Sequence, residues 1–198
     1  AQYKSTYQRM ISYAQVVTGA QLFTQMHMDG AYRVSPCLQI IRNDYLRATG
    51  LRFYEGTIYE DNMFNFECIM QAQRVSHENI QLFCRRIRDS STVTKATTYQ
   101  NFHGYFVCWS MMTGKALQMT LPKQTQTEVL KHLSTIRSSA IRIGRQLRIQ
   151  EITDNINKEN PLLKDLYYNQ FHPYILQGSG KSHSPKGITV ESQLQALQ

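Results

Sequence analysis

The chain has 198 residues, of which 41% are hydrophobic and 18% are charged, which is ordinary usage for a globular domain with one core. No stretch approaches the about 20 apolar residues of a membrane-spanning helix, and residues 1–5 lack the apolar segment of a signal peptide. The four cysteines form no Cys-x-x-Cys pair, so neither a zinc site nor a disulfide framework is indicated. We therefore expect a cytoplasmic protein with reduced, mostly buried thiols.

The net charge of +8 is concentrated in residues 81–150, which hold 11 basic and 2 acidic residues and so carry +9, while the rest of the chain carries −1. A basic surface attracts phosphate groups, whether they belong to a sugar nucleotide, a lipid-linked acceptor, an anionic membrane or a nucleic acid. Within this region, cations and apolar residues over 123–150 have the spacing of an amphipathic helix. Packing of its apolar face against the rest of the chain is the default interpretation, and docking on a membrane surface is the alternative.

Helix caps and chain breakers divide the N-terminal half into short elements. Thr18 and Gln21 have capping-box spacing, which predicts a helix that runs to about Asp29 and is ended by Gly30. The other elements expected in this half are an extended segment over 32–41, a short helix over 44–50, a loop or short strand over 51–58, a helix over 60–73, and short strands over 75–77 and 80–88.

After residue 94 the pattern is helical. Two long helices are expected over 95–119 and 123–150, and a shorter one begins at Asn160-Pro161, a good cap followed by proline at the first helical position. Aromatic residues between Tyr99 and Trp109 recur at steps of three and four, which indicates a helix face in the core. Residues 178–198 have little apolar content and are predicted to be a mobile tail.

Glu60 and Asp61 are the only adjacent pair of acidic residues in the chain, and aromatic residues flank them. Apolar neighbours raise the pKa of a carboxyl group by desolvation, so a carboxylate here can serve as a catalytic base. Acids are also ordinary in the first turn of a helix, where they interact well with the helix dipole. The spacing alone favours the helix start over the catalytic base.

A series of short motifs runs in a fixed order through this part of the chain. The motifs are Val17-Thr18-Gly19, Tyr32-Arg33-Val34-Ser35-Pro36, Ile41-Arg42-Asn43-Asp44-Tyr45-Leu46, Gly50-Leu51-Arg52-Phe53-Tyr54-Glu55-Gly56, Tyr59-Glu60-Asp61-Asn62, Ala72-Gln73-Arg74-Val75, Leu82-Phe83 and Arg86-Ile87-Arg88-Asp89-Ser90-Ser91. Over about residues 14–110 they resemble the C-terminal half of the catalytic domain of family 2 glycosyltransferases, which are inverting, nucleotide-sugar-dependent enzymes of the GT-A fold.

This resemblance implies roles for two groups of residues. Asp61 corresponds to the family's general base, with Glu60 beside it. Arg86, Arg88 and Ser91 match the family's Arg-x-Arg-x-x-Ser segment near the nucleotide diphosphate, where guanidinium groups can stabilise the leaving group. Without the resemblance, a solvated basic strand end explains the arginines equally well.

Tyrosines that flank the family motifs are the candidates for contact with the acceptor. They are Tyr32, Tyr54 and Tyr59. Some GT-A enzymes also use a late histidine as a metal ligand, but the six histidines of this chain have no mutual ligand spacing and none occupies a matching position. No metal ligand is predicted among them.

The chain departs from the family because it contains no Asp-x-Asp motif. In the family this motif precedes the matched region and holds a Mg or Mn ion on the diphosphate, since hard cations prefer carboxylate oxygens. At ~30 residues per strand-helix-strand unit, the nucleotide-binding half would add on the order of 100 residues. We therefore expect the chain to be a fragment, with most of the divalent cation's ligands outside it.

The expected fold is α+β and helix-dominated. Residues 1–110 would be the C-terminal part of a GT-A glycosyltransferase domain with few short strands, 111–177 a helical extension of long helices, and 178–198 a flexible tail. The resemblance implies transfer of a sugar to a glycan or lipid-linked acceptor in bacterial envelope polysaccharide synthesis, at the cytoplasmic side and with peripheral contact to the anionic membrane. No nucleic acid partner is expected.

Two other interpretations remain open. One is a basic helical binding module for nucleic acid or an anionic membrane surface, which would owe its character to residues 81–150. The other is a non-catalytic assembly piece. The ordered motifs around Glu60 and Asp61 favour the enzyme, because a binding module has no need of them.

Overall fold

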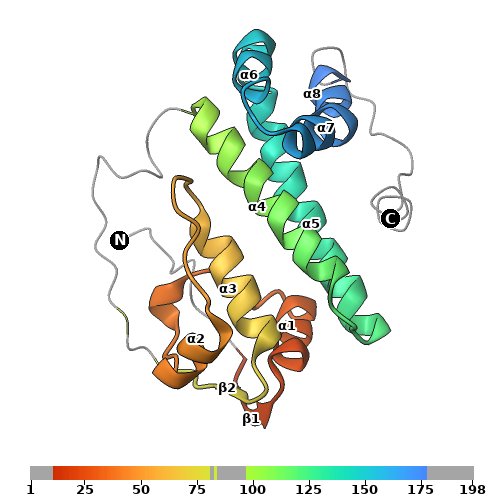
Figure 1. The fold of residues 1–198 in the computed structure, drawn as a ribbon. Helices are drawn as coiled ribbons and strands as arrows, with labels where there is room; N and C mark the ends of the chain where they lie inside the picture. Colours follow the sequence, from red (N-terminus) through yellow and green to blue (C-terminus); the bar gives the residue numbers. More distant parts are fainter. Residues whose placement is uncertain (1–10, 81–82, 84–96, 178–198) are drawn as a thin grey trace. The chain divides into compact units, whose positions relative to one another are not determined.

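The computed structural model describes residues 11–80, 83 and 97–177, which fall into two compact units (Figure 1). The first unit takes in residues up to 55, 60–88 and 120–129, and the second takes in 56–59, 89–119 and the chain from 130 onward. The expected α+β, helix-dominated class is confirmed at this level. None of the described helices is long and apolar enough to cross a membrane.

The first unit contains a small sheet and four helical segments. In chain order they are β1 (Tyr13–Val17), α1 (Gly19–Met28), the 3-10 helix η1 (Pro36–Leu38), α2 (Asn43–Thr49), α3 (Glu60–Gln71) and β2 (Val75–His77). The two strands pair antiparallel with an irregular register, Tyr13 opposite His77 and Val17 opposite Val75. The start of α5 (Lys123–Gly144) also belongs to this unit through residues 123–129.

The predicted caps of this unit are confirmed. The Thr18 hydroxyl accepts the backbone N–H of Gln21, and the Gln21 side chain accepts the N–H of Thr18 at 3.0 Å, which completes the capping box of α1. Helix α2 ends at Gly50, whose left-handed backbone (φ 66°) suits a residue without a Cβ atom. Strand β1 was not predicted, because its central residues are exposed and its sequence has no alternation of apolar and polar residues.

Helix α3 is the most buried element of the first unit. On one side Phe66, fully buried, meets the equally buried Phe23 of α1 edge to face, with ring centroids 6.0 Å apart. On another side Phe64 and Cys68 form a cluster with Leu51, against which α2 also packs. Apolar burial on more than one side is what holds this 12-residue helix in place.

The second unit is built around aromatic side chains. It comprises α4 (Tyr99–Leu117), residues 130–144 of α5, α6 (Ile149–Ile156), α7 (Pro161–Gln170) and α8 (His172–Gln177). Phe106 of α4 meets Phe171 edge to face at 5.0 Å, and Phe102 meets Tyr167 at 6.1 Å. The predicted aromatic core face of α4 is therefore confirmed for Phe102 and Phe106, and α7 begins as predicted with Asn160 accepting the N–H of Leu163.

The single helix expected over 123–150 is wrong, because α5 ends at Gly144 and α6 starts at Ile149. The apolar spacing continues through the break, so periodicity could not reveal it. At Gly144 a Cβ atom would lie 2.7 Å from the Ile175 side chain of α8, which shows how closely the chain packs where the helix stops. The contact that accompanies the break comes from a residue 31 positions away in sequence, beyond the reach of local pattern.

The expected domain boundary and the last expected strand differ from the structure where they can be compared. The boundary expected at residue 110 falls inside α4, and the compact units divide the chain elsewhere. Of the strand expected over 80–88, Ile80 and Phe83 are described and lie outside any strand, while the rest of that segment lies outside the described residues. The tail expected over 178–198 also lies outside them.

Two arginines of the α5 region tie α7 and α8 to the second unit. The buried guanidinium of Arg137 donates two hydrogen bonds to the carbonyl of Gln170, at 3.1 and 2.5 Å, and lies 4.3 Å from the centre of the Tyr174 ring. Arg145, which is exposed, donates in the same forked manner to the carbonyl of Tyr174, at 3.1 and 2.9 Å. Both bonds use the planar fork that lysine lacks.

We predict that Arg137→Lys lowers the free energy of unfolding by about 1–3 kcal/mol, because lysine loses the fork and the ring contact inside the core. Arg145→Lys removes the same fork at the surface and should cost less than about 1 kcal/mol. Urea unfolding of the two variants measures both values. Equal losses would contradict the argument from burial.

Candidate active site

Glu60 and Asp61 form the first turn of α3, as the helix-start interpretation predicted. Both side chains are half-buried, although the first turn of a helix commonly faces solvent. The Asn62 side chain donates a hydrogen bond to the Asp61 carboxylate at 3.2 Å. A carboxylate at this end of a helix also interacts favourably with the helix dipole.

The surroundings of Asp61 raise the pKa of its carboxyl group above the ordinary value. Burial contributes most, and the negative charge of neighbouring Glu60 adds to it, while backbone hydrogen bonds from Asn62 and from Asp61 itself act in the opposite direction. A raised pKa makes the carboxylate a stronger base than an exposed aspartate. The helix-start and catalytic-base interpretations are therefore compatible at this position.

A chain of side-chain hydrogen bonds leads to Asp61 from the η1 segment. The amide of Asn65, which is 1% exposed, donates to the backbone carbonyl of Asp61 at 2.7 Å. The Gln39 amide nitrogen donates in turn to the Asn65 side-chain oxygen. The Gln39 side-chain oxygen is buried and has no hydrogen-bond partner among the described residues.

The loop that leads into α3, residues 56–59, belongs to the second unit and holds a strained residue. Tyr59 has φ 65°, the only positive φ among described residues other than glycine. This conformation costs an L-residue about 1–3 kcal/mol and occurs more often at functional sites. The strained residue directly precedes the Glu60-Asp61 pair in the chain.

One face of α4 holds Tyr59 in this conformation. Asn101 donates to the Tyr59 hydroxyl at 2.9 Å, the Tyr105 ring stacks on the Tyr59 ring at 4.2 Å, and the Cys108 thiol donates to the Tyr59 carbonyl at 3.1 Å. Gly104 lies on the same face, where a Cβ atom would be 2.5 Å from the Ile58 carbonyl oxygen. These four positions follow the i, i+3, i+4, i+7 spacing of one helix face.

The other predicted site residues differ in how accessible their side chains are to a ligand. Tyr54 is 44% exposed in the loop before α3, so its ring is available to a ligand. Tyr32 packs edge to face on Phe23 at 4.9 Å, and the Tyr59 ring is occupied by its contacts with α4. Arg86, Arg88 and Ser91 lie outside the described residues.

Within the described ranges, no group of three or more His, Cys, Asp or Glu side chains could hold a metal ion. His27 instead pairs with the buried Glu128 at 2.7 Å, and His103 pairs with Glu159 at 2.9 Å. Of the cysteines described, Cys68 and Cys108 are buried free thiols, as expected, whereas Cys37 is exposed.

Sequence reasoning missed the residues that hold the site in place. Asn65 carried a usable signal, because it lies one helical turn after Asp61, where a side chain can reach the earlier carbonyl. Gln39 and Cys108 carried none, since their partners are 26 and 49 positions away in the chain.

Comparisons with known proteins give no further guide to function. No protein-family model matches the chain, and neither curated proteins nor solved structures include a significant match. A functional assignment therefore depends on the residues and geometry of the chain.

We predict that Asp61→Asn stabilises the protein at neutral pH. A carboxyl group with a raised pKa in the fold ionises less readily there than in the unfolded chain, so its contribution to stability falls as pH rises through the unfolded value of about 3.9 and the folded value above it. The variant removes this penalty. Urea unfolding should give a higher midpoint for Asp61→Asn at pH 7 and no difference from wild type near pH 3.

Asp44 provides a control of opposite sign. Arg42 and the backbone N–H of Tyr45 lower the pKa of this exposed carboxyl group, so its contribution is present above the unfolded pKa and is lost as pH falls through the folded value. Asp44→Asn should therefore destabilise the protein at pH 7. An Asp61→Asn variant that behaved like Asp44→Asn would contradict the assignment of a raised pKa to Asp61.

We also predict that Gly104→Ala destabilises the protein by about 1–3 kcal/mol, because the new methyl group would collide with the Ile58 carbonyl and displace the 56–59 loop. Gly114→Ala, on the same helix with open space around the added atom, is the matched control. It should stabilise the protein by about 0.5–1 kcal/mol. Urea unfolding tests both, and a neutral Gly104→Ala would show that α4 does not support the loop.

Proposed function

We propose that the chain is the acceptor-side part of an inverting, nucleotide-sugar-dependent glycosyltransferase related to family 2, with Asp61 as its general base. The observation that carries the proposal is the position of Asp61, a half-buried carboxyl group with a raised pKa directly after a strained loop. The ordered motifs on both sides of it provide the second support.

In the proposed reaction Asp61 takes the proton of an acceptor hydroxyl as that oxygen attacks the anomeric carbon of the donor sugar. The bond between the anomeric carbon and the diphosphate breaks on the opposite face, and the nucleoside diphosphate carries away the electron pair. One carboxylate is sufficient for this single displacement with inversion. A raised pKa brings the base closer to neutrality, where proton transfer is most effective.

The exposed Tyr54 ring, seven residues before Asp61, is the best described candidate for contact with the acceptor. Aromatic faces suit the apolar face of a sugar ring, so a glycan or lipid-linked acceptor fits this position. In this proposal the enzyme serves bacterial envelope polysaccharide synthesis at the cytoplasmic side of the membrane.

The donor side of the proposed site extends beyond the described residues. Arg86, Arg88 and Ser91 are proposed to bind the diphosphate through guanidinium and hydroxyl groups. A Mg or Mn ion would neutralise charge on the leaving diphosphate, but the described residues offer no cluster that fits it. Because the chain contains no Asp-x-Asp motif, we propose that most of the cation's ligands and most of the nucleotide site lie outside these 198 residues.

One observation favours the alternative of a basic binding surface. Residues 129–150 contain no acidic residue, and Lys131, Arg142 and Arg145 are exposed there. The one acid of α5, Glu128, is buried and pairs with His27. Such a surface would bind nucleic acid or anionic lipid with a steep dependence on salt, which distinguishes it from sugar transfer.

The test of the proposed function is release of nucleoside diphosphate from a panel of UDP- and GDP-sugars with Mn, using the chain joined to the upstream residues of its own gene. We predict that Asp61→Asn slows release about 100- to 10,000-fold, which is the usual contribution of a general base. Donor binding and folding should persist, because the change removes no donor contact.

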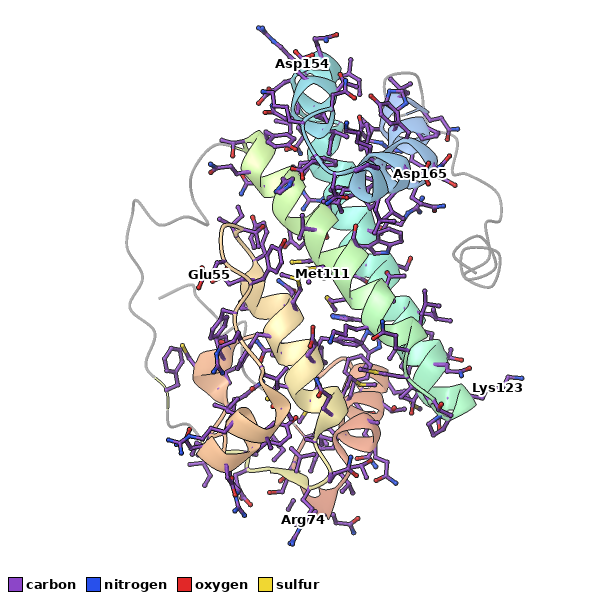
Figure 2. The ribbon with its side chains drawn as sticks, in the orientation of Figure 1. Glu55, Arg74, Met111, Lys123, Asp154 and Asp165 are labelled. Atoms are coloured by element: carbon purple, nitrogen blue, oxygen red, sulfur yellow. The ribbon has the colours of Figure 1, made fainter. Side chains whose placement is uncertain are left out.

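Glu55→Gln is the matched control, since Glu55 is an exposed acid in the loop that precedes α3 (Figure 2). It should release nucleotide at close to the wild-type rate. Equal rates for Asp61→Asn and wild type, or no release from the folded enzyme on any donor, would overturn the proposed function and favour the binding surface.

A further inference from the structure

The half-buried Gln39 and the buried Asn65 form a polar pair whose only described link to the rest of the site is the backbone of Asp61. We propose that they are positioning residues, which fix the first turn of α3 so that the Asp61 carboxylate points at the acceptor hydroxyl. This role depends on the proposed function of Asp61, but the geometry behind it does not.

The hydrogen bonds dictate how both amide groups are oriented. Asn65 must present its NH₂ group to the Asp61 carbonyl, so its oxygen faces Gln39. Gln39 must then present its own NH₂ group to that oxygen. This leaves the Gln39 oxygen buried without a donor, and turning the amide over would place two oxygen atoms against each other.

Packing alone does not require this arrangement. Two apolar side chains of similar shape would fill the same space at little or no cost in stability. Asn65 is itself 1% exposed in a helix whose other buried positions are mostly apolar. The chain therefore keeps a polar pair where the core does not need one.

The Gln39–Asn65 pair acts on the first turn of α3, where the position of Asp61 matters for the proposed catalysis. The first turn of a helix frays, because its N–H groups have no partners inside the helix. Asn65 ties the Asp61 carbonyl from one turn further in, and Gln39 connects Asn65 to η1, where the Gln39 N–H donates to the Pro36 carbonyl at 3.2 Å. Displacement of a catalytic group by about 1 Å can cost on the order of 100-fold in rate.

The test replaces both amides by apolar residues of similar size, Gln39→Met with Asn65→Leu, in the 198-residue chain. Removal of both partners should leave the urea midpoint unchanged or higher. The pKa of Asp61, measured by NMR titration of its side-chain carboxyl carbon, should fall toward the ordinary value, because the first turn opens to water. Glu60 is the neighbouring titratable group. It is replaced by Gln in the reference chain and in the double variant, so that its charge does not contribute to the measured pKa of Asp61.

Thr24→Val with Thr125→Val is the matched control. These buried hydroxyls share a hydrogen bond of 2.9 Å between α1 and the start of α5 in the same unit, so the control also removes a buried polar pair. It should leave the Asp61 pKa as it is. An Asp61 pKa that is unchanged in the Gln39/Asn65 double variant, at any stability, overturns the positioning role.

Kinetics separate this proposal from the proposed function. In the complete enzyme, the double variant should lower kcat for sugar transfer at least tenfold and leave KM for the donor unchanged, since neither residue belongs to the proposed donor site. If wild-type enzyme releases no nucleotide, the proposed function fails and the pKa result still decides whether the pair controls Asp61. If wild type is active and the double variant equals it, the positioning role alone is wrong.

Discussion

The burial of α3 on several sides is the constraint on which the rest of the first unit depends. Phe66 packs against α1 while Phe64 and Cys68 pack with Leu51 near α2, so the helix cannot turn about its axis without exposing one of these surfaces. Each fully buried apolar side chain contributes about 1.5–3 kcal/mol. Because the helix is held in this way, its first turn is half-buried too, and Asp61 is partly desolvated as a consequence.

Two features near this turn cost stability, and they lie close together in the chain. Asp61 is ionised less readily than an exposed aspartate, and Tyr59 adopts a strained backbone. Proteins tolerate such costs mainly at functional sites, where surrounding contacts enforce them. Their concentration around one helix start is the physical reason to look for chemistry there rather than elsewhere in the described chain.

Within the second unit, helix α4 holds the residue that precedes Glu60 in the chain. Its Asn101, Tyr105 and Cys108 contact Tyr59. These three residues lie before the helical extension predicted over 111–177, so that prediction did not identify the part of α4 that supports the loop. The same helix directs its other aromatic residues to Phe171 and Tyr167, so core packing and loop support occupy different faces of α4.

The sequence by itself determined the features that depend on neighbours within one turn of chain. These are the Thr18 cap, the stop at Gly50, the Asn160-Pro161 helix start, and the helix that begins with Glu60 and Asp61. Capping and left-handed turns are local hydrogen-bond and steric effects, so short patterns encode them.

Only the tertiary structure decided the break after Gly144, the strained Tyr59, and the contact of Gln39 with Asn65. Each of these depends on contacts between residues that are dozens of positions apart, and no local pattern records which distant side chain will meet which backbone group.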